Sequence, residues 1–289
     1  FLIMFGYSSH EFLSLQWRSL PYGLALLSPP SKAVNVSENT LRHLILKQIN
    51  SCLYIRFEKE FDKLADSPWW HVINDDPTSV ELESFSSNTR NQIRKGLKHY
   101  ICRQVEIDDI ALLYDVYVQT QSEYNTFEPT LSLPEFLSAL NSLPDTSEFW
   151  IVIDKLTNET VGFSENYIED YTCFYNSIWI LPSAMKNYAG YTLFYEMNRH
   201  YLLSRNFKYV SDGARSLSHD TQIHSFLIQK FRFRKAYSSL SVVYVSWLSI
   251  LVSIIYPFSP LISALPFTFA RKISLLLYLE KISRQCRSK

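Results

Sequence analysis

The chain has 289 residues, which is enough to bury a large core and to form one large domain or two small ones. Lys and Arg total 28 and Asp and Glu total 28, so no overall field attracts nucleic acid or a membrane. Only 6 glycines argue against a glycine-rich nucleotide fingerprint, and four scattered cysteines without a C-x-x-C pair support neither a metal nor a redox motif. We therefore expect no metal site and reduced thiols in a cytoplasmic protein.

The first 87 residues contain short apolar segments separated by Pro29, Pro30 and polar turns. Their pattern predicts strands over 52–57 and 70–73 and a helix over 40–49. Because aromatic residues are frequent and low-complexity runs are absent, we expect residues 1–87 to form a small folded lobe.

A cation-rich helix is predicted next, with Thr89 as its N-cap. Arg90, Arg94 and Lys98 recur every four residues and therefore share one edge, beside an apolar stripe. These cations either form a solvated charged face or bind an anionic substrate, and the sequence leaves both interpretations open.

From residue 101 the predicted order is strand, helix, helix, three strands, helix, strand, helix, strand. The two helices cover 108–124 and 134–143, the three strands lie within 149–181, and later strands cover 208–212 and 238–245. Short hairpins imply antiparallel pairing, and the alternation of strands and helices at the end implies a parallel crossover. The sequence therefore predicts an α/β fold with a mixed sheet.

One strand-to-helix loop in this region, at 186–192, points backbone N–H groups at one spot, which favours a phosphate. With this loop, residues 101–245 resemble the GNAT superfamily of N-acyltransferases. In that family the loop Arg/Gln-x-x-Gly-x-Gly/Ala binds the coenzyme A pyrophosphate. The matching residues here are Lys186, Asn187, Tyr188, Ala189, Gly190 and Tyr191.

The basic helix before this region is similar to one in the Fem-type branch, which includes peptidoglycan-bridge aminoacyltransferases. This resemblance implies a GNAT-like domain over 88–245, a smaller lobe over 1–87, which could be a partial GNAT-like lobe, and a tail over 246–289. It also implies transfer of an acetyl, other acyl or aminoacyl group to an amine of a small molecule or a cell-envelope precursor. The implied donor is acetyl-CoA or another acyl-CoA, with aminoacyl-tRNA as the alternative.

Some residues depart from the family pattern. Ala189 and Tyr191 replace small glycines, and Ile228 lies where many members have the tyrosine that protonates the leaving thiolate. The alternative to an enzyme is therefore a non-catalytic binding or membrane-associated protein on a GNAT scaffold.

Acyl transfer to an amine requires a base and donors for an oxyanion. We expect the donors to be backbone N–H groups near Ile180 and Leu181, where this strand splays from its parallel neighbour. Because ligands of open sheets bind beyond the carboxyl ends of strands, the candidate bases are Asp212 and His219, with Glu165 as a third. Singly, Asp212 also suits a turn and His219 a helix cap. The candidate substrate-binding residues are Arg90, Arg94, Lys98 and Arg215.

The tail has two parts. Residues 236–270 contain no charged residue and no His, and Pro257, Pro260 and Pro266 interrupt them, so we expect no clean spanning helix. From Arg271 the pattern predicts an amphipathic helix with Leu275, Leu276, Leu279, Ile282 and Cys286 on one face. This helix suits the inner, anionic surface of a membrane, docking on its own domain, or a second subunit in a homodimer.

Overall fold

The computed structural model describes residues 9–20, 22–32, 37–48, 52–123, 130–215, 222–263 and 268–287. Over these residues, eleven strands form a sheet in the order β1-β2-β3-β4-β11-β5-β10-β9-β8-β7-β6. The strands are β1 (Ser9–Phe12), β2 (Leu15–Leu20), β3 (Gly23–Leu26), β4 (Tyr54–Lys59), β5 (Trp69–Asn74), β6 (Tyr100–Val105), β7 (Ser147–Asp154), β8 (Thr160–Glu169), β9 (Thr172–Ile180), β10 (Tyr209–Ala214) and β11 (Arg234–Tyr244). Pairs β9–β10 and β3–β4 are parallel and the other described pairs are antiparallel, which confirms the predicted mixed sheet.

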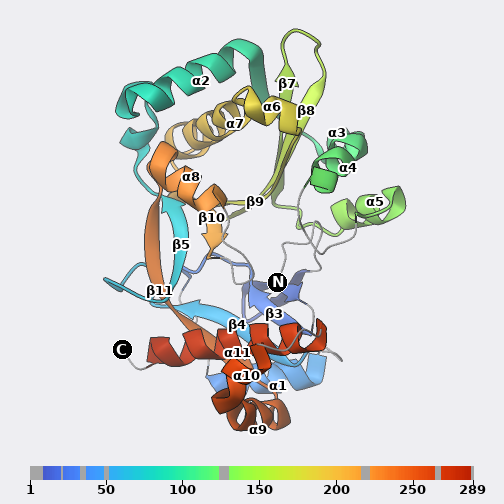
Figure 1. Cartoon of the computed structure of the whole chain (residues 1–289), viewed down its shortest axis with the longest axis vertical. Helices are drawn as coiled ribbons and strands as arrows, with labels where there is room; N and C mark the ends of the chain where they lie inside the picture. The colour runs from blue at the N-terminus through green and yellow to red at the C-terminus, as the bar shows by residue number, and fades with distance from the viewer. Residues whose placement is uncertain are drawn as a thin grey trace.

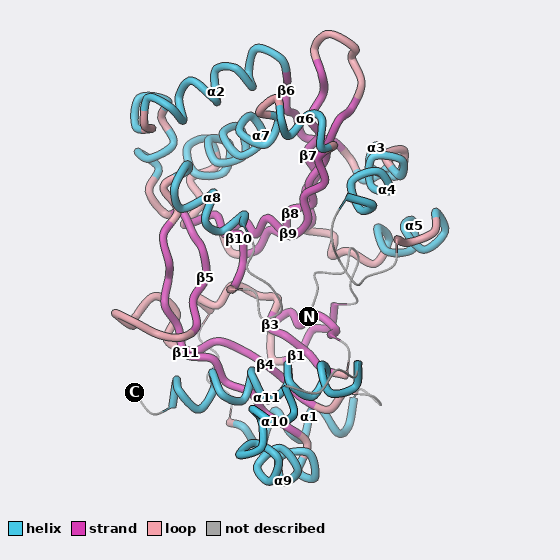
Figure 2. Tube along the Cα trace, viewed as in Figure 1, coloured by secondary structure: helices cyan, strands magenta, loops and turns pink. Residues whose placement is uncertain are grey.

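Helices cover both faces of this sheet (Figure 1). The helices are α1 (Glu38–Gln48), α2 (Ser87–His99), α3 (Ile107–Ala111), α4 (Tyr114–Glu123), α5 (Leu133–Asn141), α6 (Pro182–Lys186), α7 (Ala189–Asn198), α8 (Gln222–Phe231), α9 (Ser246–Ile255), α10 (Ser259–Ser263) and α11 (Thr268–Arg287). Helices α7 and α8 lie on one side of β8 and β9, and α3, α4 and α5 lie on the other (Figure 2). The face under α7 and α8 therefore carries a core of its own.

Strands β5 and β11 join the two halves of the molecule. Strand β5 lies between β10 and β11 and is antiparallel to both. Strand β11 pairs with β5 through its first residues, Arg234 to Ser238, and with β4 through Ser239 to Tyr244. The segment predicted as an N-terminal lobe thus supplies a central strand of the larger sheet, and backbone ladders connect the halves.

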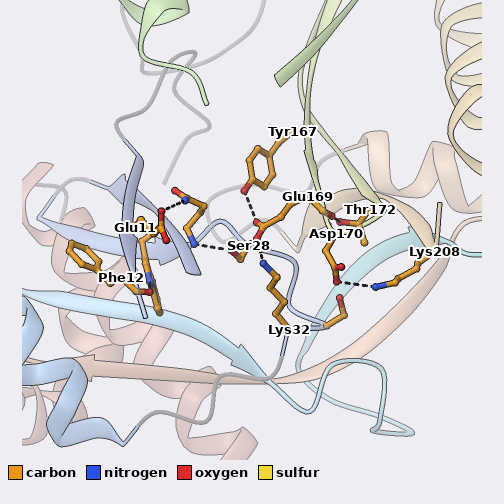
Figure 3. Close-up of polar contacts among 12 residues, drawn as sticks. Glu11, Phe12, Ser28, Lys32, Tyr167, Glu169, Asp170, Thr172 and Lys208 are labelled. Carbon is orange, nitrogen blue, oxygen red and sulfur yellow. Dashed lines mark hydrogen bonds and ion pairs between the residues drawn. The ribbon is translucent and has the colours of Figure 1, made fainter. Parts of the chain in front are cut away.

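Polar contacts fasten the N-terminal segment to the turn between β8 and β9 (Figure 3). The Glu169 carboxylate accepts hydrogen bonds from Ser28 Oγ at 3.0 Å and from Tyr167 Oη at 2.6 Å. Lys32 pairs with the same carboxylate. Because three donors from two parts of the chain share one partly buried acceptor, this turn is held in place.

Helix α2 starts three residues earlier than the sequence predicts. Ser86, and not Thr89, is the N-cap, because its Oγ accepts the Thr89 N–H at 3.3 Å. Thr89 is therefore buried inside the first turn. Near the other end of the helix, a Cβ on Gly96 would lie only 2.6 Å from the Tyr188 carbonyl oxygen at the start of α7. The glycine allows α2 to pack directly onto α7.

The single helix predicted over 108–124 is divided into α3 and α4. A tight turn closed by the Leu113 N–H and the Ile110 carbonyl, at 2.9 Å, separates them. The turn leaves Leu112 82% exposed and allows both Ile110 and Tyr117 to pack with Phe136 of α5 in one core.

The first part of the tail differs from the prediction, and the second part follows one of the predicted alternatives, docking on its own domain. Pro257 lies in the first turn of a short 3-10 helix and Pro260 is the second residue of α10, positions where proline is tolerated, so they do not end the helical path. Among the described residues, Ser246–Ser263 is long and apolar enough to cross a membrane by length and composition, with 11% of it buried. Helix α11 instead buries Leu277, Leu279 and Ile282 against β11 and its neighbours.

Candidate functional site

The sheet opens where β9 and β10 part. These parallel strands pair only from Thr172 to Phe174 and from Tyr209 to Ser211. On its other side β10 pairs with β5, with an irregular register between Ser211 and Ala214. The carboxyl end of β10 is therefore free of β9 and kinked, which is where open α/β sheets bind ligands. The predicted splay between these strands is present.

Asp212 is the first residue of β10 beyond the paired segment, and it contacts a histidine of α8. The Oδ2 atom of Asp212 lies 3.2 Å from Nε2 of His224, and the side chains are 9% and 15% exposed. The same Nε2 lies 3.5 Å from the Asp212 carbonyl oxygen. Next along the strand, Gly213 has φ +81, so the kink requires glycine for its backbone conformation.

Burial controls the electrostatics of this pair. It raises the pKa of Asp212, while the hydrogen bond and charge of His224 act in the opposite direction. An aspartate that contacts one imidazole nitrogen fixes the tautomer and leaves the other nitrogen to accept a proton. The pair therefore has the arrangement of a carboxylate-oriented general base.

His224 was not among the residues predicted from the sequence. His219 was predicted instead because it is closer to Asp212 along the chain, and it lies outside the described residues. The signal that could have found His224 is its place as the third residue of α8. In a strand-to-helix unit, the first turn of the helix returns to the carboxyl end of the strand before it.

Arg215 is directed away from this pair. Its guanidinium donates to the Pro68 carbonyl at 2.8 Å and to Tyr278 Oη at 3.0 Å, and it stacks on Trp70 at 4.4 Å from the ring centroid. These contacts join β10 to the β5 segment and to α11. The Arg215 guanidinium is thus held against Pro68, Trp70 and Tyr278.

Glu165 lies on the opposite face of the sheet from Asp212. Ser164 and Asn166, its neighbours in β8, contact Met197 of α7, so Glu165 points to the other side. There it accepts a hydrogen bond from Ser147 Oγ at 3.0 Å, and burial raises its pKa to about 7. The structure therefore does not bring Glu165 and Asp212 together.

The expected phosphate loop is partly buried by the chain itself. Ala189 and Gly190 are buried. A Cβ on Gly190 would lie 3.1 Å from Met185 Sδ of α6, and α2 packs against the Tyr188 carbonyl. Lys186 and Asn187 are exposed and Tyr191 is half-buried. A pyrophosphate approaching the start of α7 would meet these side chains first.

The remaining predicted cofactor-binding positions belong to the sheet. Ile180 pairs with Gly162 in β8, and the Leu181 N–H donates to the Val161 carbonyl at 2.9 Å. The Leu181 N–H therefore has a partner in the folded chain. Ile228, at the position of the family tyrosine, is packed against the core under α7 and α8.

The cations of α2 are divided between two roles. Arg90 donates to the carbonyls of Phe85 at 2.8 Å and Glu83 at 3.2 Å, so it stabilises the segment before the helix. Arg94 and Lys98 are exposed. Lys95 lies 5.6 Å from the Tyr188 ring centroid, above the start of α7. Arg94, Lys95 and Lys98, with Lys186 of α6, are called the α2 basic strip below.

Two clefts lie elsewhere on the described chain, and neither is lined by Asp212 or His224. One, of about 360 Å³, is lined by Cys102, Arg103, Gln104, Trp150, Glu196, Arg199, His200 and Ser204. Burial raises the pKa of Cys102, which disfavours a thiolate nucleophile there. The second, of about 210 Å³, lies among α1, α9 and α11. The described residues contain no group of three or more His, Cys, Asp or Glu side chains placed to hold a metal ion.

Comparison with solved structures supports the architecture. FemX aligns with 85% of this chain and 90% of its own, with a TM-score of 0.56 and 9% identity. The C-terminal domain of a putative lysylphosphatidylglycerol synthetase from Agrobacterium fabrum aligns with 87% and 88%, with a TM-score of 0.52 and 13% identity. L-PGS from Bacillus licheniformis aligns with 94% and 86%, with a TM-score of 0.51 and 10% identity.

The chain has a Fem-like fold. No protein-family model matches the sequence, and the search of curated proteins returned no match. At these identities the comparisons concern the fold, and the predicted Fem-like, mixed α/β architecture is confirmed.

Proposed function

We propose that this chain is an acyltransferase in which the pair Asp212 and His224 deprotonates the amine of an acceptor. The observation that carries the proposal is the 3.2 Å contact between these side chains at the carboxyl end of β10, where β9 and β10 part. The fold shared with FemX and with lysylphosphatidylglycerol synthetase domains supports the same class of reaction.

The reaction needs one proton relay. His224 takes a proton from the acceptor ammonium, and the free amine attacks the carbonyl carbon of the donor to form a tetrahedral intermediate. Collapse of the intermediate breaks the bond to the leaving oxygen or sulfur, and the imidazolium returns a proton to that atom. The nitrogen, which carries an extra proton after the attack, releases it to solvent, so that a neutral amide and a neutral alcohol or thiol result. Asp212 holds the ring and stabilises its positive charge. Because Ile228 cannot donate a proton, this relay through His224 replaces the family tyrosine.

For the donor we favour aminoacyl-tRNA over acyl-CoA. At the start of α7, which would hold a coenzyme A pyrophosphate, α2 packs against the Tyr188 carbonyl and Met185 lies beside Gly190. The α2 basic strip presents four cations outward, and exposed Arg and Lys bind phosphate in a nucleic-acid backbone. The acceptor is an amine of a small molecule or of a cell-envelope precursor.

Two assays on the full chain test this proposal. A ligand that binds only the folded state must raise the melting temperature. Because we expect none of them to bind, free coenzyme A, acetyl-CoA and longer acyl-CoAs should leave the melting temperature unchanged. Transfer of a radiolabelled amino acid from bulk aminoacyl-tRNA to a mixture of cell-envelope precursors should be measurable. It should fall by roughly 10²- to 10⁴-fold in Asp212→Asn and His224→Gln, as expected for a lost general base.

The outcomes separate the alternatives. A clear thermal shift with an acyl-CoA would reject the tRNA donor while leaving acyl transfer. A non-catalytic binding protein is the second candidate, favoured by Ile228 at the family tyrosine position. That candidate is supported if tRNA binds and neither donor class yields product, and the Asp212→Asn variant then binds tRNA as tightly as the wild type does.

A further inference from the structure

Helices α9 and α10 lie at one end of the molecule (Figure 1) and carry a group of exposed apolar side chains. Fourteen large apolar side chains are exposed among the described residues, and six of them lie between positions 247 and 261. They are Trp247, Ile250, Leu251, Ile254, Phe258 and Leu261, with exposed fractions of 57%, 64%, 43%, 62%, 56% and 70%. The others are scattered along the chain. Single exposed apolar residues are ordinary in soluble proteins, whereas a group of this size marks an interaction surface.

Helix α9 has one buried face and one exposed apolar face. Leu248 and Val252 are buried in the core with β11 and α11. At 100° per residue, Trp247, Ile250 and Ile254 share the opposite face. The helix therefore lies flat on the domain and presents one apolar side outward. This packing favours a helix that lies on a bilayer over one that crosses it.

The charges that the tail contributes around this surface are mainly positive, while Glu38 of α1 lines a cleft beside α9 together with Arg42. From Ala236 to the last residue, Lys289, the sequence contains six cations and one acid, Glu280. Glu280 is 6% exposed and pairs with Arg284 at 2.7 Å, so it contributes little outward charge. Lys272 and Lys281 of α11 are exposed, and Arg284 stacks on Tyr256, 4.0 Å from the ring centroid, beside α9 and α10.

We propose that the outward face of α9 and α10 docks on the surface of an anionic phospholipid bilayer. Apolar side chains enter the boundary between headgroups and acyl chains, and the cations of α11 contact the headgroups. A second copy of the chain is the less suitable occupant, because a two-fold interface would bring the same cations against themselves. The docking surface is α9 and α10 and not α11, whose apolar face is already buried.

Vesicle binding of the full chain tests this docking. The wild type should bind vesicles of phosphatidylcholine mixed with phosphatidylglycerol more tightly than vesicles of phosphatidylcholine alone. The double variant Ile250→Ser/Ile254→Ser should bind both about tenfold more weakly or worse, since two aliphatic side chains no longer leave water. Lys272→Gln/Lys281→Gln should lose the preference for anionic vesicles by about fivefold per cation. Alkaline carbonate should release the wild type from the vesicles.

A matched control is available in the same chain. Leu112→Ser/Leu156→Ser removes two aliphatic side chains that are 82% and 93% exposed at other places. This variant should bind vesicles as the wild type does, and all variants should melt within a few degrees of it. Equal vesicle binding by Ile250→Ser/Ile254→Ser and Leu112→Ser/Leu156→Ser would overturn the proposal. Wild-type protein that stays on the vesicles in alkaline carbonate would also overturn it. Loss of a dimer in light scattering by Ile250→Ser/Ile254→Ser, with vesicle binding unchanged, would also overturn it and would assign the face to a second copy. None of these readouts depends on the proposed acyl transfer.

Discussion

Gly96 allows helix α2 to pack closely on α7, and its substitution by alanine tests how close this packing is. In Gly96→Ala the new Cβ would lie 2.4 Å from Thr192 Oγ1 and 2.6 Å from the Tyr188 carbonyl oxygen. A Gly to Ala change inside a helix stabilises by about 1 kcal/mol. Overpacking costs about 1–3 kcal/mol, and here the upper part of that range applies because one contact is backbone. We expect a net loss of about 1–2 kcal/mol, or a melting temperature lower by about 2–4 °C for each kcal/mol.

The matched substitution is Gly190→Ala in the first turn of α7. Its Cβ would lie 3.1 Å from Sδ of Met185, a side chain that is 50% exposed and free to rotate. The helix-propensity gain should therefore dominate, and the variant should be unchanged or more stable by up to about 1 kcal/mol. Urea unfolding with the slope held in common measures both variants. If Gly96→Ala is as stable as Gly190→Ala, the close packing of α2 on α7 is wrong.

Three further predictions test the assignment of individual side chains. The variants Asp212→Asn and His224→Gln should lose about equal activity, and the double variant should lose little more, because the two residues act as a unit. If the loss in the double variant equals the product of the two single losses, the pairing is contradicted. In Glu165→Gln, stability should exceed that of the wild type above pH 7 by at most about 3 kcal/mol and converge with it below pH 5. The folded-state pKa of about 7 lies above the ordinary 4.5, so the wild type loses stability as pH rises between these values; parallel pH profiles would contradict this. Arg215→Met should lower the free energy of unfolding by about 1.5–3 kcal/mol through its lost hydrogen bonds, with KM unchanged; a raised KM with full stability would instead indicate substrate binding.

The sequence predicted the elements better than it predicted their contacts. The strands at 52–57 and 70–73 and the order of strands and helices after residue 101 are present, because alternation and helical periodicity are local signals. The position of β5 between β10 and β11 was not predictable in this way. Strand order depends on which apolar faces meet, and residues far apart in the chain decide that.

In the candidate site too, the sequence predicted a residue of an element but not the contact that this residue makes. Asp212 could be selected from the sequence because it lies near the carboxyl end of a strand that precedes a helix. Its partner was not, since the contact with His224 depends on the turn of α8 that faces the strand. For Arg215, the contacts with Pro68 and Tyr278 were also not predictable, because both partners are distant from it in the chain.

The packing of α2 makes the choice of donor testable in one variant. Helix α2 packs against the Tyr188 carbonyl at the start of α7, and we propose that this docking competes with the binding of a coenzyme A pyrophosphate there. Weakening that docking by Gly96→Ala should then raise coenzyme A affinity if the loop is a latent pyrophosphate site, because the ligand no longer opposes the full packing free energy. We expect calorimetry to detect no coenzyme A binding to either the wild type or Gly96→Ala. Binding that appears only in Gly96→Ala would show that the loop has kept its anion-binding geometry beneath α2, and binding to both would reject the aminoacyl-tRNA donor.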